Sequence, residues 1–126
     1  MIGVAAVVAE LGRVLLALPG IEEARQQLGP RPAVEVARRL GRETHRRRSE
    51  SARASLRRAI GWADRRLLPR GGNCYRRVLL EIALDAGAAD EPVMMGFRAA
   101  GGPGSGHAWL RSAPPQDQVY DAVISV

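Results

Sequence analysis

Cysteine, lysine and aromatic residues are scarce in this chain, and each scarcity excludes something. The single cysteine excludes an intramolecular disulfide framework and a structural metal site of four cysteines. All 19 basic residues are arginine, and none is lysine. One Phe, two Tyr and two Trp leave few rings to stack on nucleic-acid bases. Because a lone thiol fits a reducing compartment, we expect a cytoplasmic protein.

Long apolar runs are also absent. Glu10 and Arg13 interrupt the apolar opening, residues 1–20, so it falls short of the roughly 18 apolar residues that a spanning helix needs. It also lacks the basic start and the cleavage site of a signal peptide. We expect an ordinary core helix here, with contact to a membrane surface or a partner as the alternative.

The charge is distributed unevenly between two parts of the sequence. Its 126 residues, 46% of them hydrophobic, are enough for one core. Residues 1–70 carry 15 arginines and 7 acidic residues, a net charge of +8, whereas residues 71–126 carry 4 and 6, a net charge of −2. We therefore expect a basic helical N-terminal region, 1–70, and a second part, 71–126, with a different role.

The first part has the pattern of several helices. Residues 2–18 form an apolar helix that we expect to end at Pro19-Gly20, with two further turns over 21–28. Pro32 stands where a helix over 33–40 would begin.

A polar segment and a longer helix follow. Residues 42–50 contain no apolar residue, so we expect this segment to be solvated. Residues 51–68 have apolar positions at steps of three and four, which predicts one buried stripe. The stripe consists of Leu56, Ile60, Ala63 and Leu67.

The second part changes to an α+β pattern. Asn73 is a good N-cap for a helix over 74–86, and Gly87 ends it. Three short runs then read as strands, which predicts an antiparallel sheet behind the helices. These runs are residues 92–98, 107–111 and 119–126.

Cys74 is the first residue of its predicted helix. Unpaired backbone N–H groups and the helix dipole there favour a thiolate over a thiol. The same N–H groups are placed to stabilise a developing oxyanion. The alternative is that Cys74 is a small buried apolar residue.

His107 and Asp121 lie on two consecutive predicted strands. If a hairpin is centred near Pro114, positions 107 and 121 face each other, with their side chains on one face of the sheet. A carboxylate in that place would hold the imidazole in one tautomer while its other nitrogen faces a thiol. We therefore predict a cluster of Cys74, His107 and Asp121.

The order of these elements resembles that of a known enzyme family. From Trp62 to Asp121 the chain is similar to the transglutaminase-like leader peptidases of lasso-peptide biosynthesis, in the papain and transglutaminase superfamily. The similarity is carried by an Arg-rich helix with Trp62, then NCYRRVLLEIALDAG, VMMGFR, GHAWL and VYDAV. It implies a minimal papain-like core in which one helix packs on three antiparallel strands.

The resemblance also implies roles for single residues. Cys74 would be the nucleophile that forms an acyl-enzyme, His107 the group that moves the proton, and Asp121 the group that orients His107. We expect three further residues to contact the substrate, namely Asn73, Tyr75 and Trp109.

Partners follow from the resemblance as well. The substrate would be the leader segment of a ribosomally made precursor peptide. A separate leader-recognition protein and an ATP-dependent cyclase would act with the peptidase. No metal or other cofactor is expected, because His45, His107 and Cys74 come from distant elements and the glycine-rich residues 101–107 lack the Lys-Ser/Thr ending of a phosphate loop.

Two other functions stay open. With an amine as acceptor in place of water, the same cluster would perform acyl transfer, as true transglutaminases do. Alternatively, the arginines at 38–58 would bind nucleic acid or an acidic partner and the cysteine would have no catalytic role. Because this arginine cluster contains no aromatic residue, nucleic acid is not the expected partner.

Overall fold

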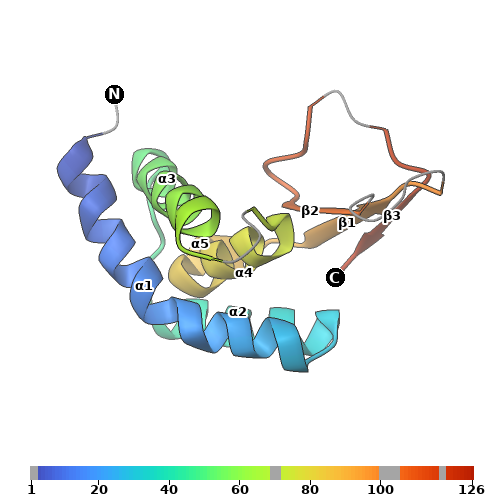
Figure 1. The fold of residues 1–126 in the computed structure, drawn as a ribbon, viewed down its shortest axis with the longest axis horizontal. Coiled ribbons are helices and arrows are strands. Elements are labelled where there is room, and N and C mark those ends of the chain that lie inside the picture. Colours follow the sequence, from blue (N-terminus) through green and yellow to red (C-terminus); the bar gives the residue numbers. More distant parts are fainter. Residues whose placement is uncertain (1–2, 69–71, 100–105, 117–118) are drawn as a thin grey trace.

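A computed structural model describes residues 3–68, 72–99, 106–116 and 119–126. Over these residues the chain forms an α+β fold, as expected, with the helices before an antiparallel sheet (Figure 1). The helices are α1 (Val4–Gln27), α2 (Pro30–Glu43), α3 (Glu50–Arg66), α4 (Cys74–Leu84) and α5 (Ala86–Ala89), and the strands are β1 (Val93–Phe97), β2 (His107–Leu110) and β3 (Ala122–Ser125).

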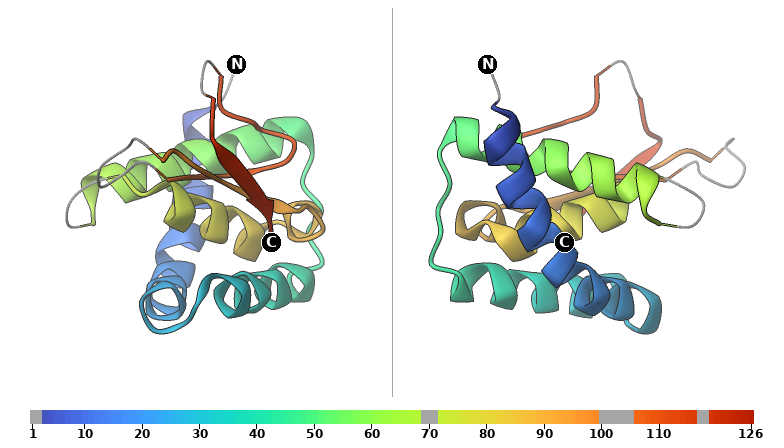
Figure 2. Two further views of the ribbon diagram at one scale, coloured as in Figure 1. Left: turned by 90° about the vertical axis from the view of Figure 1, so that its right-hand side faces the viewer. Right: turned by 60° about the vertical axis from the view of Figure 1, so that its left-hand side comes forward.

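Helix α1 continues through Pro19, so the predicted break at Pro19-Gly20 is wrong. A proline inside a helix removes one hydrogen bond and kinks it, and Figures 1 and 2 show α1 changing direction partway along. Val14 and Ile21, one on each side of the proline, are both fully buried. Burial on either side of the kink therefore holds the two halves in one helix.

Helices α2 and α3 lie where the sequence predicts helices, although α2 extends three residues beyond each end of the predicted range 33–40. Ser49 caps α3 by accepting the N–H of Ala52 at 3.2 Å. Three members of the predicted stripe are buried, whereas Leu67 is 47% exposed because it follows the last turn. The buried members are Leu56, Ile60 and Ala63.

The segment between α2 and α3 is only partly solvated, which corrects the prediction for residues 42–50. The side chain of Arg48 is 7% exposed. It donates to the Leu84 carbonyl at 2.9 Å and pairs with the carboxylate of Glu10. Arginine thus enters the interior here because a carboxylate and a carbonyl satisfy it.

Helix α4 begins at Cys74, as predicted, and it ends two residues earlier than expected. Asp85 interrupts the helix and accepts the N–H of Gly87 at 2.9 Å, which starts the short helix α5. Six residues of α4 between Val78 and Ala83 are buried. Figure 2 shows α4 surrounded by the other helices.

The core runs through both parts of the sequence. Helix α4 packs against α1, α2 and α3, so residues from 1–70 and from 71–126 share one apolar cluster. Gly41 of α2 lies so close to α4 that a Cβ atom there would overlap the Ile82 carbonyl. This close contact between helices therefore joins the two parts.

The sheet has the order β2-β1-β3, with both outer strands antiparallel to β1. His107 pairs with Gly96, and Gly96 pairs with Val123. The predicted hairpin between the strands of His107 and Asp121 is therefore wrong. Strand β1 carries the buried residues Val93 and Met95, whereas every residue of β3 is exposed, so the sheet buries its central strand more than β3.

Candidate active site

Cys74 is held in place by a doubly capped helix start. The Asn73 side chain accepts the N–H of Arg76 at 3.0 Å, as an N-cap should. The N–H of Asn73 itself donates to a carboxylate oxygen of Asp64 on α3, at 2.9 Å. Asn73, the residue before Cys74, is thus bonded both to the first turn of α4 and to α3.

A buried ion pair supports the same helix start. Asp64 is fully buried, and Arg76 is 3% exposed. Arg76 Nε donates to Asp64 Oδ1 at 2.8 Å, and its Nη2 lies 2.7 Å from the same oxygen. Asp64 was not predicted from the sequence, because the local signal was only an acidic residue near the end of an arginine-rich helix.

Cys74 and His107 line one cleft, of about 240 Å³. Cys74 Sγ accepts the N–H of Ala108, the residue after His107, at 3.4 Å. The structure records no hydrogen bond between the sulfur and the His107 ring among the residues it describes. The cleft therefore brings together two of the three residues predicted from the sequence, with the sulfur seated against the backbone of β2.

The electrostatic surroundings keep His107 neutral. Its pKa is lowered from the ordinary value of 6.5, first because the ring is partly buried and then because Arg77 and Arg98 repel a second positive charge. A neutral imidazole at pH 7 is able to accept a proton.

Two aromatic rings flank the imidazole. The ring centroids of Trp109 and Tyr120 lie 5.9 Å and 6.4 Å from that of His107, and 5.3 Å from each other. Tyr120 lies over Gly96, where a Cβ atom would approach the ring to 2.6 Å. Tyr120 was missed by the sequence analysis, since only the fold shows that it reaches across β1 toward His107.

Asp121 lies apart from His107. The two residues are at least two strand spacings apart, about 10 Å, because β1 stands between β2 and β3 and Val123, not Asp121, lies in line with His107. The Asp121 carboxylate accepts the N–H of Ala99 at 2.6 Å, and its own N–H donates to the Phe97 carbonyl at 2.9 Å. The direct pairing of His107 with Asp121 predicted from the hairpin is thus absent.

The three residues expected to contact substrate have different surroundings. Trp109 lines the cleft. The Asn73 side chain is occupied by the helix cap, and the Tyr75 hydroxyl donates to the Pro30 carbonyl at 3.5 Å. Burial raises the pKa of Tyr75. Of these three residues, Trp109 alone lines the cleft.

Charged side chains form another wall of the cleft. Arg57 Nε donates to Glu81 Oε1 at 2.9 Å, and Arg53 donates to Glu81 Oε2 at 2.7 Å. Glu81 is 7% exposed, so the two arginines satisfy a nearly buried carboxylate. This wall was not predicted, because it depends on the packing of α3 on α4.

Metal ligands do not gather anywhere in the described part of the chain: no group of three or more His, Cys, Asp or Glu side chains is placed to hold an ion.

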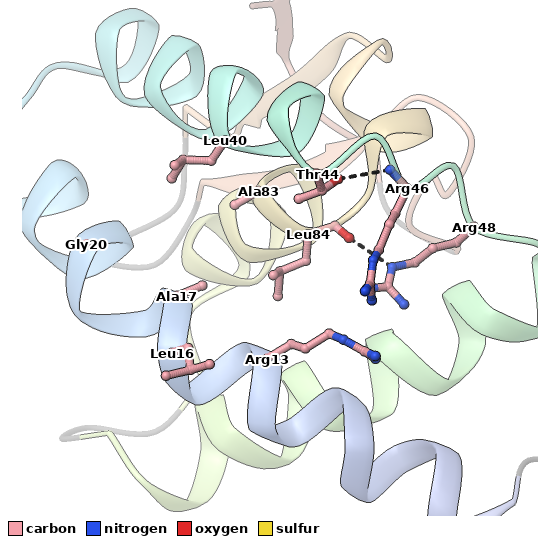
Figure 3. Close-up of a pocket in the computed structure, with 10 residues that line it drawn as sticks. All are labelled: Arg13, Leu16, Ala17, Gly20, Leu40, Thr44, Arg46, Arg48, Ala83 and Leu84. Carbon is pink, nitrogen blue, oxygen red and sulfur yellow. Dashed lines mark hydrogen bonds between the residues drawn. The ribbon is translucent and has the colours of Figure 1, made fainter.

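Helix α1 is long and apolar enough to cross a membrane by length and composition, and only 17% of its most apolar window is buried. A larger cavity of about 600 Å³ lies at the other end of α4 (Figure 3).

No protein-family model matches this chain, and no curated protein or solved structure matches it.

Proposed function

We propose that the protein is a cysteine peptidase that removes the leader from a ribosomally made precursor peptide. The observation that carries the proposal is the cleft in which Cys74, the first residue of α4, lies beside the strand that begins at His107. The motif around these residues, similar to that of lasso-peptide leader peptidases, supplies the substrate class.

The reaction would begin with attack of Cys74 on the scissile carbonyl. The thiol proton passes to the neutral His107, and a C–S bond forms. Asn73 takes the N–H groups of Arg76 and Arg77, which leaves those of Cys74 and Tyr75, at the N-terminal end of α4, to stabilise the oxyanion.

Three proton transfers would complete the cycle. His107 gives its proton to the leaving amine as the C–N bond breaks, which leaves an acyl-enzyme. Water then attacks the acyl group and gives a proton to His107, which passes it to the Cys74 sulfur as the C–S bond breaks and the acid leaves. The resemblance assigns the orientation of His107 to Asp121, while the structure places Trp109 and Tyr120 against the ring.

The size of the cleft is consistent with a division of labour. About 240 Å³ accommodates a few side chains around the scissile bond rather than a whole leader. A separate leader-recognition protein would supply affinity, and an ATP-dependent cyclase would use the released core peptide. Both partners belong to the proposal through the family resemblance.

The ion pairs within the arginine cluster weigh against the alternative in which these arginines only bind nucleic acid or an acidic partner. Six of its nine arginines between 38 and 58 pair with acidic residues in this structure. The paired residues are Arg38, Arg42, Arg47, Arg48, Arg53 and Arg57.

The test uses p-nitrophenyl acetate, which reacts without a known peptide substrate. We expect a burst of p-nitrophenol equal to the enzyme concentration and an acetyl group on Cys74 by mass spectrometry. Cys74→Ala should abolish the burst, and His107→Ala should slow it at least 100-fold. A burst that persists in Cys74→Ala, or an unchanged rate in His107→Ala, would refute the proposal. Adding butylamine separates the two chemistries, because acyl transfer gives the butylamide whereas hydrolysis gives acetate.

A further inference from the structure

The cavity at the far end of α4 has no part in the proposed peptidase. It is an open cavity lined by α1, the end of α2, the turn that follows α2, and the last residues of α4 (Figure 3). Its α4 residues are Ala83 and Leu84, about 15 Å along the helix from Cys74. The cavity is therefore a separate feature of the molecule.

Its walls differ in character from one side to the other. Figure 3 shows the guanidinium groups of Arg13, Arg46 and Arg48 gathered on one side. Aliphatic side chains occupy the rest, and two of them leave much apolar surface to water, Leu16 at 86% and Leu40 at 39% exposure. Such a surface is typical of a binding site.

The cationic side is only partly neutralised. Glu10 Oε1 accepts from Arg13 at 2.8 Å and also from Arg48. The Arg46 side chain makes no hydrogen bond or ion pair with any residue that the structure describes. Two guanidinium groups thus share one carboxylate and a third is unpaired among the described residues, which leaves a net positive charge at the cavity wall.

One of these arginines is rigidly placed. Arg48 is nearly buried, and its Nε is fixed by the Leu84 carbonyl at 2.9 Å while Nη1 holds Glu10. Figure 3 shows the bond to Leu84 crossing between the charged and the aliphatic side. The boundary between the two sides is therefore part of the folded framework.

We propose that this cavity binds an anionic amphiphile. The anionic head, a carboxylate or a phosphate, would lie among Arg13, Arg46 and Arg48, since a guanidinium donates two parallel hydrogen bonds to either group. The aliphatic chain would cover Leu16 and Leu40. A volume of about 600 Å³ is in the range of small-molecule sites, which favours a free amphiphile over a protein partner.

Calorimetric titration with three probes of equal chain length tests the proposal. Dodecanoate and dodecyl phosphate distinguish the two anionic heads, and dodecyltrimethylammonium carries the opposite charge. Each is used below its micelle concentration. We expect saturable binding of at least one anionic probe, with at least tenfold weaker binding of the cationic one.

Two pairs of matched variants locate the site. Gly20 lines the cavity and Gly12 does not, yet both lie in α1 and a Cβ atom at either would enter open space. Gly20→Leu should therefore weaken binding at least tenfold, while Gly12→Leu changes it less than twofold. Arg46→Glu should also weaken binding at least tenfold. Its control is Arg39→Glu, at an exposed arginine outside the cavity, which should change binding less than twofold.

Several results would overturn the proposal. These are equal binding of the cationic probe, unchanged binding in Gly20→Leu or Arg46→Glu, and loss of binding in both members of a pair. Binding of an acidic Leu/Glu peptide without binding of either anionic amphiphile would also overturn it. Circular dichroism and the melting temperature show that each variant folds. The acetate burst at Cys74 is a separate readout, so failure of one proposal leaves the other standing.

Discussion

At the scale of single residues, the chemistry depends on how His107 is held and charged. Its ring lies beside the rings of Trp109 and Tyr120, and burial together with Arg77 and Arg98 lowers its pKa. A base that is neutral at pH 7 is ready to accept the thiol proton.

The lowered pKa of His107 predicts a pH dependence of stability. Because the folded pKa lies below the unfolded value of about 6.5, the unfolded chain binds more protons. The stability that this group contributes is present above pH 6.5 and is lost as the pH falls through the folded pKa. Urea unfolding between pH 7.5 and 5.5 should show this decline in the parent. In His107→Gln the same window should be flatter, and an equal slope would contradict the assignment.

Two neighbours compete for the role of orienting His107. Tyr120→Leu removes the ring that packs on the imidazole, whereas Asp121→Asn removes the carboxylate that the resemblance assigns to this role. From the geometry we expect the larger loss for Tyr120→Leu, about tenfold or more in the acetate burst rate, and less than threefold for Asp121→Asn. The opposite order would restore the role of Asp121 and imply a rearranged third strand.

At the scale of elements, the start of α4 holds both the candidate nucleophile, Cys74, and the contacts that join α4 to α3. Asp64 joins α3 to this point through Arg76 and through the N–H of Asn73. The helix cap, the buried ion pair and the nucleophile therefore depend on one another.

Removing the carboxylate of Asp64 should be costly. Asp64→Asn removes the nearer of two carboxylates that face the buried Arg76, since Glu22 Oε2 lies 3.4 Å from its Nη1. Breaking a buried ion pair costs about 3–5 kcal/mol, and we expect a loss at the lower end of this range because Glu22 remains. Urea unfolding at pH 7 measures the loss. Arg77→Gln is the control, since Arg77 lies 3.6 Å from the same carboxylate but is 39% exposed, and we expect less than about 1 kcal/mol there. Equal losses would contradict the prediction, because the exposed pair with Arg77 would then matter as much as the buried pair with Arg76.

At the scale of the whole molecule, the charge asymmetry of the sequence does not mark two cores. The apolar cluster includes Val14 and Leu56 from the first part and Leu79 and Val93 from the second. Helix α4 of the second part packs against α1, α2 and α3 of the first part.

A single core predicts a single unfolding transition. Trp62 reports on the first part and Trp109 on the second, so each is followed by fluorescence in the Trp109→Phe and Trp62→Phe variants respectively. We expect each fluorescence curve to coincide with the circular dichroism curve of the same variant. Fluorescence that changes at a different urea concentration in either variant would show that the two parts unfold separately.

Local patterns in the sequence determined much of this protein. Caps and periodicity placed α2, α3 and the start of α4, and they placed Cys74 at its first residue. Asn73 was predictable as a cap because the interaction spans only three residues along the chain.

The tertiary structure decided what depends on distant partners. Strand order depends on which distant segments pair, and here β1 pairs with both other strands and separates His107 from Asp121. Pro19 stays inside α1 because packing on both sides of it outweighs the lost hydrogen bond. Arg48 and Asp64 are buried because their counter-charges arrive from other helices. Such pairings join residues far apart in sequence, and no local pattern encodes them.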